Sequence, residues 1–181
     1  MLLIATRARK RRLRPLSLVV VVATLAAAAT AEAAVSDFIR SQAASQGHAL
    51  LDAARAMPAD RYGYAPDPSQ MTFGALVLHV AVGNYLFCSR IGGTPEPAQK
   101  PSPPGESKDS LVQRLQDSFD FCTRSLASLD DAKLSEVLDV ASVKMPRSMA
   151  ILTLNGTWNT HLTMAQDYLA QNAQKTTAAS K

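Results

Sequence analysis

The chain of 181 residues carries 19 Lys and Arg against 15 Asp and Glu, which gives a formal net charge of +4. This length suffices for one domain with an extensive core. The positive excess lies in the first 33 residues, which hold six bases and one acid. Residues 34–181 therefore carry 13 bases and 14 acids, a net charge of −1. Such a balance argues against a phosphate-binding surface, and we expect no nucleic-acid partner.

Residues 1–33 have the pattern of a secretory signal peptide. The cationic segment RARKRRLR precedes the uncharged run LSLVVVVATLAAAA, and small residues follow at the spacing that cleavage requires. The apolar run is shorter than the roughly 20 residues of a membrane span, and it ends in alanines rather than in basic residues. We predict cleavage after Ala31 or Ala33, export to the periplasm or the medium, and membrane contact only before cleavage.

The first two helices are predicted from apolar residues at helical spacing. One runs from about residue 35 to residue 57, with Ser36 as a candidate N-cap. A segment rich in proline and glycine follows it. The second helix spans residues 71–91, where Ser69 can cap its start and Gly92-Gly93 ends it.

The third predicted helix spans residues 110–129, and Asp130 can cap a short extra turn after it. The fourth begins after Pro146 and runs to about Asn172. No segment alternates convincingly between apolar and polar residues, as a half-buried strand would. We therefore predict an all-α four-helix bundle over residues 34–174 and a disordered tail over residues 175–181.

The two cysteines, Cys88 and Cys122, favour a disulfide, because an even pair in an exported domain is first read as one. Two free thiols or two thiolate metal ligands are the alternatives. In a hairpin of helices two and three, the cysteines would lie much farther apart than the ~7 Å that a disulfide spans. The proline-rich segment between these helices can extend ~45 Å, which exceeds the ~33 Å of helix three. The disulfide thus predicts up-down-down-up topology, with a long crossover between helices two and three.

The three histidines, His48, His79 and His161, fall at similar heights when each is measured from the ends of its helix. Imidazoles at one level can hold a divalent metal ion, which needs three protein ligands and an open position. His48 lies roughly opposite Leu50 on the helical wheel, however, so it can point out of the core. For each histidine alone, a surface position or a hydrogen-bonded core position is the alternative.

The stretch MPADRYGYAPDPSQMTFGALVLHVAVGNYLFC resembles the DinB-like (DinB/YfiT) superfamily. The resemblance covers about residues 36–172 and implies an up-down-down-up four-helix bundle. It also implies a metal site formed by a histidine on helix two and two residues, commonly His-x-x-x-His, on helix four. His79 matches the helix-two ligand, and His161, with Tyr168 seven residues later, matches the second ligand of helix four.

The chain departs from this pattern four residues before His161, where Thr157 replaces a ligand. A neutral hydroxyl is a poor zinc ligand. The implied cofactor is a divalent ion, Zn, Ni, Mn or Fe, held by His79 and His161. Extra water or His48 would complete its coordination, or the site is degenerate and holds no metal.

Two functional hypotheses remain open, and the sequence does not decide whether the chain is an enzyme. By resemblance, relatives include thiol-dependent transferases, an isomerase and presumed hydrolases, in which the ion would activate water or a thiolate between helices two and four. The alternative is a non-catalytic binding or stress-related bundle. No general base stands out, so catalytic residues stay unassigned. The small-molecule substrate is not identified, and a homodimer is left open.

Overall fold

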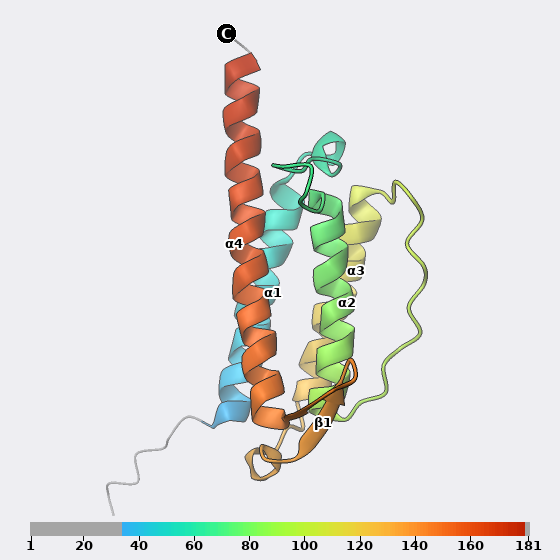
Figure 1. Ribbon diagram of the computed structural model, residues 1–181, viewed down its shortest axis with the longest axis vertical. Helices are drawn as coiled ribbons and strands as arrows, with labels where there is room; N and C mark the ends of the chain where they lie inside the picture. Colours follow the sequence, from blue (N-terminus) through green and yellow to red (C-terminus); the bar gives the residue numbers. More distant parts are fainter. Residues whose placement is uncertain (1–33, 180–181) are drawn as a thin grey trace, which may run out of the picture. The chain divides into compact units, whose positions relative to one another are not determined.

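The computed structural model describes residues 34–179, with side chains up to residue 174. In this part of the chain four helices pack side by side, joined by short 3₁₀ helices, a β-hairpin and loops (Figure 1). In chain order the elements are α1 (Val35–Ala56), η1 (Ala59–Arg61), α2 (Phe73–Gly92), α3 (Lys108–Leu126), η2 (Asp131–Lys133), β1 (Val137–Val140), β2 (Val143–Pro146) and α4 (Arg147–Ala179). The predicted signal peptide lies outside the described residues.

The hairpin of β1 and β2 corrects the prediction of an all-α fold. The two strands pair antiparallel, with Val140 opposite Val143. Ala141 and Ser142 form the turn with φ angles of 52° and 67°, a conformation that usually selects Asn-Gly or Asp-Gly. Strands of four residues joined by Ala-Ser therefore carry no hairpin signal in the sequence. Val140 is buried where β1 packs against α2 and α4.

The start of α1 is capped from a distant part of the chain and not by the predicted Ser36. The carboxylate of Asp131 accepts hydrogen bonds from the backbone N–H groups of Val35, at 2.8 Å, and Ser36, at 2.9 Å. The bond from the Ser36 N–H is the main reason why the pKa of Asp131 lies below its ordinary value. A cap supplied from another segment leaves no trace in the local sequence of α1.

The start of α2 also differs from its prediction. The hydroxyl of Thr72 accepts a hydrogen bond from the N–H of Ala75 and so caps the helix. Ser69 instead donates from its backbone and its hydroxyl to Asp67 in the preceding turn. The end of α2 is as predicted, because Gly93 adopts the left-handed conformation with φ 70°.

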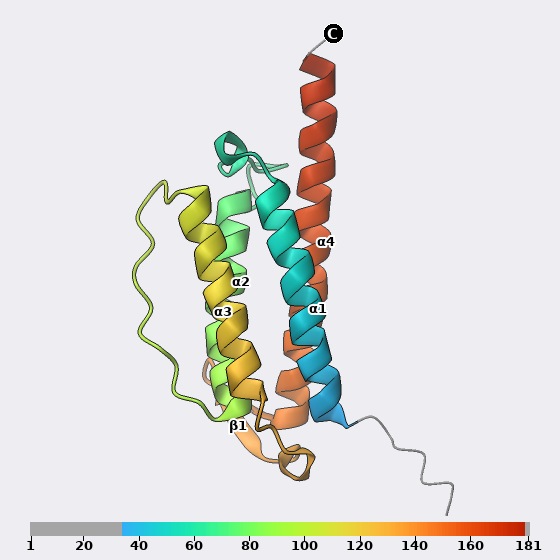
Figure 2. The ribbon, with the colours of Figure 1, turned by 180° about the vertical axis from the view of Figure 1, so that it is seen from behind.

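The remaining boundaries shift by a few residues. Ser107 caps α3, which begins at Lys108, earlier than predicted. Asp130 accepts a hydrogen bond from the N–H of Ala132, as a cap of the short turn η2 should. α4 continues to Ala179, past the predicted boundary of the bundle at residue 174, and extends beyond the ends of the other helices (Figures 1 and 2).

Contacts along α2 and α3 show that these two helices run in the same direction. Gly74 lies against Leu111 near their starts, and Gly92 lies against Ser125 near their ends. Between these contacts the predicted disulfide joins Cys88 and Cys122, whose Cα atoms are 5.1 Å apart. Both thiols are therefore used, and neither is available as a metal ligand. Residues 93–107 pass along the outside of the bundle and return the chain to the start of α3 (Figures 1 and 2).

The core is centred on α2, the one helix of the described part that is long and apolar enough to cross a membrane. Its apolar residues here pack against the other helices. At the centre of the core, Asn84 accepts a hydrogen bond from the indole N–H of Trp158 at 2.6 Å and donates one to Ser118 at 3.0 Å. All three side chains are buried, so these bonds satisfy polar atoms of α2, α3 and α4 together.

Candidate metal site between α2 and α4

The structure brings His79 of α2 and His161 of α4 together. Their ring centroids are 5.0 Å apart, and the ring planes meet at 71°. The contact of Phe73 with Tyr168 on one side of the pair, and the bond from Trp158 to Asn84 on the other, show that α2 and α4 are antiparallel here. This register sets the two histidines at one level.

The environment of His161 favours its neutral imidazole form. Burial lowers the pKa of His161 below its ordinary value, the adjacent His79 lowers it further, and the nearby backbone carbonyl of Thr157 acts in the opposite direction. Nδ1 of His161 is buried and lacks a hydrogen bond of good geometry. A neutral imidazole with one free nitrogen is the form that binds a metal ion.

The distance between the rings suits two ligands of one ion. Bonds of about 2.1 Å to both imidazoles at a near-tetrahedral angle would separate the centroids by about 5 Å. Among residues 34–174, however, no group of three or more His, Cys, Asp or Glu side chains could hold a metal ion. Two imidazoles alone would supply only part of the coordination sphere of such an ion.

His48 does not join the pair. Its side chain is exposed and lines a hollow of about 390 Å³ between α1 and α3, beside Phe119, Asp120 and Thr123. The helical-wheel argument that His48 can point out of the core agrees with this position. Because His48 faces α3 and not α4, the hypothesis that it completes the metal site is wrong for this conformation.

The sequence reasoning singled out Thr157 but missed Gly83, which lies one helical turn from His79. Gly83 follows His79 by four residues, as Thr157 precedes His161 by four. In antiparallel helices these two positions fall at one level, next to the pair. The signal in the sequence was a glycine, Gly83, one turn after the candidate ligand His79. A glycine leaves space where a side chain would otherwise lie.

A hollow beyond the pair lies along the same helix. It has a volume of about 340 Å³ and is bounded by the loop before α2, at Pro66, Asp67 and Gln70, and by α4. Met164, one turn after His161, is among its lining residues. The face of α4 that carries His161 therefore also lines this hollow one turn further along the helix.

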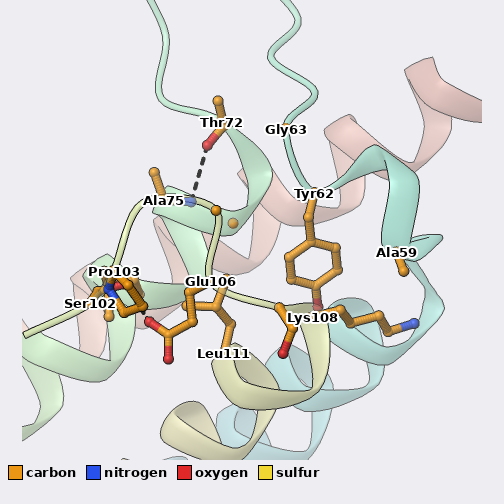
Figure 3. Close-up of a pocket in the computed structure, with 14 residues that line it drawn as sticks. Ala59, Tyr62, Gly63, Thr72, Ala75, Ser102, Pro103, Glu106, Lys108 and Leu111 are labelled. Atoms are coloured by element: carbon orange, nitrogen blue, oxygen red, sulfur yellow. Dashed lines mark hydrogen bonds between the residues drawn. The ribbon is translucent and has the colours of Figure 1, made fainter. Parts of the chain in front are cut away.

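A separate hollow of about 630 Å³ lies where the starts of α2 and α3 meet the end of the proline-rich loop (Figure 3). Its polar groups already have partners. Glu106 accepts hydrogen bonds from Ser102, Ser110 and Arg114, and the Lys108 ammonium donates to two backbone carbonyls of the α1 end. Neither histidine of the pair lines this hollow, and we do not assign it to the site.

The fold and the histidine pair define a class of protein, a four-helix bundle with a candidate metal site between its second and fourth helices. The model of the DinB superfamily matches residues 42–168, and the chain belongs to this family. The chain is also similar to a DinB-like protein from Bacillus subtilis whose crystal structure is known. The TM-score is 0.63 at 17% identity, with 75% of this chain and 92% of that chain covered. This identity supports the fold alone, and no curated protein matches significantly.

Proposed function

We propose that this chain is an exported DinB-superfamily protein that binds a divalent metal ion through His79 and His161. The observation that carries the proposal is the 5.0 Å separation of two imidazoles from neighbouring helices. Imidazole ligands suit Zn, Ni and Fe better than Mn, which prefers carboxylates. When bound, the ion would act as a Lewis acid toward a substrate atom, in the manner of a metal-dependent hydrolase or transferase.

The protein's own residues would orient the site. α4 carries His161, whose ring lies near the backbone carbonyl of Thr157 and whose Nδ1 is buried. His79 is more exposed and reaches the pair from the edge of α2. Substrate therefore approaches from the open side of α2 and α4, without passing through the core.

The disulfide supports export, because Cys88 and Cys122 are buried and disulfides persist in oxidising compartments. A chain that begins at Glu32 or Ala34 and is found in the periplasm or medium would agree with export. Recovery of the uncleaved chain from the cytoplasm alone would contradict it.

A second candidate function is a non-catalytic binding or stress-related bundle with a degenerate metal site. The observation that favours it is the lack of a third His, Cys, Asp or Glu ligand within residues 34–174. The two candidates differ in metal content, which can be measured without knowledge of a substrate.

The test is metal analysis of the purified, disulfide-bonded chain after equilibration with Zn, Ni, Mn or Fe. We expect about one equivalent of Zn or Ni in the wild type and loss of this metal in His79→Ala and His161→Ala. His48→Ala is the matched control, and it should bind as the wild type does. Less than about a tenth of an equivalent in the wild type, under metal-replete conditions, would overturn the proposal.

A further inference from the structure

We propose that the hollow of about 630 Å³, where the starts of α2 and α3 meet the proline-rich loop, binds an uncharged apolar small molecule. This site is separate from the histidine pair and needs no metal ion. The class of ligand follows from the wall of the hollow, which offers apolar surface and whose polar side chains already form hydrogen bonds within the chain (Figure 3).

The wall of the hollow is mainly apolar. Five of its residues carry hydrocarbon side chains, namely Ala59, Ala75, Leu78, Pro103 and Leu111, and three more are glycine. Ala59 and Ala75 are exposed and Leu78 is half-buried, so part of this apolar surface meets solvent. An apolar ligand would remove it from water, which is favourable in proportion to the area covered. The volume of the hollow is typical of sites for small molecules.

The two charged side chains on the wall are both engaged. The ammonium of Lys108 donates to the backbone carbonyls of Arg55 and Met57 at the end of α1, at 2.6 and 2.9 Å. The carboxylate of Glu106 is only 5% exposed and accepts hydrogen bonds from Arg114, at 2.6 Å, and from two serine hydroxyls. A charged ligand would have to break these bonds or stay unpaired, and either is costly in a partly buried place.

The neutral polar side chains on the wall also have partners. The hydroxyl of Tyr62 donates to the carbonyl of Ala54 at 2.7 Å, which leaves the ring as the contribution of Tyr62 to the wall (Figure 3). The hydroxyl oxygens of Thr72 and Ser107 accept the backbone N–H groups of their own helix starts. The hydroxyl of Ser102 is one of the two that bind the carboxylate described above. Recognition in this hollow therefore depends on apolar contact and shape.

The apolar surface continues along α2 under the same loop. A second hollow of about 410 Å³ shares Leu78 with the first and is bordered by Ala81, Val82 and Tyr85 of α2 and by residues 97–100 of the loop. Val82 is 47% exposed, although it belongs to the most apolar helix of the described part. A ligand longer than the first hollow therefore finds apolar surface beyond it.

The experiment compares two fluorescent probes with the same ring skeleton on the full disulfide-bonded chain. N-phenyl-1-naphthylamine is uncharged, and 8-anilino-1-naphthalenesulfonate differs from it by a sulfonate group. Both emit more strongly when they leave water, so a titration gives a Kd for each. We expect the uncharged probe to bind at least about tenfold more tightly, because the one cation on the wall of the first hollow is already paired.

Two substitutions locate the bound probe. Ala75→Trp places a large ring in the hollow from an exposed position, so it should weaken binding of the uncharged probe about tenfold or more. Ala44→Trp is the matched control, because Ala44 is also an exposed helical alanine but borders the hollow between α1 and α3. It should bind as the wild type does. Leu78→Asn nearly keeps the side-chain volume and makes the wall polar. It should weaken binding severalfold and serves if Ala75→Trp does not fold by circular dichroism.

Three results would overturn the inference. The first is a folded chain that does not bind the uncharged probe, and the second is binding that survives both Ala75→Trp and Leu78→Asn. The third is equal or tighter binding of the sulfonate, which would indicate an anion site in place of an apolar one. Metal binding by His79 and His161 is measured separately, so failure of this inference leaves the proposed function untouched.

Discussion

The two sides of α2 differ in how they meet their neighbours. Toward α3 the backbones are so close that a Cβ on Gly92 would lie 2.1 Å from the Ser125 carbonyl oxygen, and a buried disulfide joins the helices. Toward α4 the helix carries the exposed His79, and Gly83 leaves open space. Close packing and a covalent link thus fix α2 on one side. A fixed helix can hold a binding residue in place at an open groove on the other.

The largest expected effect tests the covalent side of this comparison. Replacing both Cys88 and Cys122 with Ala frees a segment closed by a sequence separation of 34 residues. We expect the free energy of unfolding, measured by urea denaturation, to fall by about 3–4 kcal/mol from loop entropy. Where the variant is still folded, its nickel loading should match the wild type. A fall in loading would show that the disulfide also positions the histidines.

An intermediate effect compares two glycines of the same helix. Gly92→Ala places a methyl group against the α3 backbone, so it should lower the free energy of unfolding by about 1–3 kcal/mol. Gly83→Ala meets no atom and improves helix propensity, so it should raise that free energy by about 0.5–1 kcal/mol. Urea denaturation of both variants checks the signs. Equal losses at the two positions would show that the α4 side is as closely packed as the α3 side.

The smallest expected effect is the pH dependence of the metal-free chain. The pKa of His161 is lowered from 6.5 in the folded state, so the unfolded chain binds this proton at higher pH. The contribution of His161 to the free energy of unfolding should therefore be complete above pH 6.5. It should be lost as the pH falls below 6.5 toward the folded-state pKa.

Urea denaturation at about pH 7.5 and about pH 5 measures this decrease, and His161→Gln should reduce it because Gln does not titrate. His48→Gln, on the exposed side of α1, is the matched control for replacing an imidazole with an amide. A wild-type chain that is more stable at the lower pH would reverse the sign and contradict the lowered pKa of the half-buried His161.

Particular residues show how far the sequence predicts this site. Helical spacing predicted a common height for His79 and His161, because the rise per residue is the same in every α-helix. The same argument gave His48 that height, yet its side chain lies in the hollow between α1 and α3. Height along a helix is local, whereas the neighbour that a side chain faces depends on how the helices are arranged around the core.

The sequence alone predicted the four helices from apolar periodicity, and it favoured a disulfide between Cys88 and Cys122. It placed three histidines at one height, and the family resemblance pointed to His79 and His161. The caps, the hairpin and the histidine contact come from the tertiary arrangement: Asp131 caps α1, residues 137–146 form a hairpin, and the rings of His79 and His161 meet. Each of these depends on segments distant in the chain, and side-chain periodicity within one element does not specify which other element packs beside it.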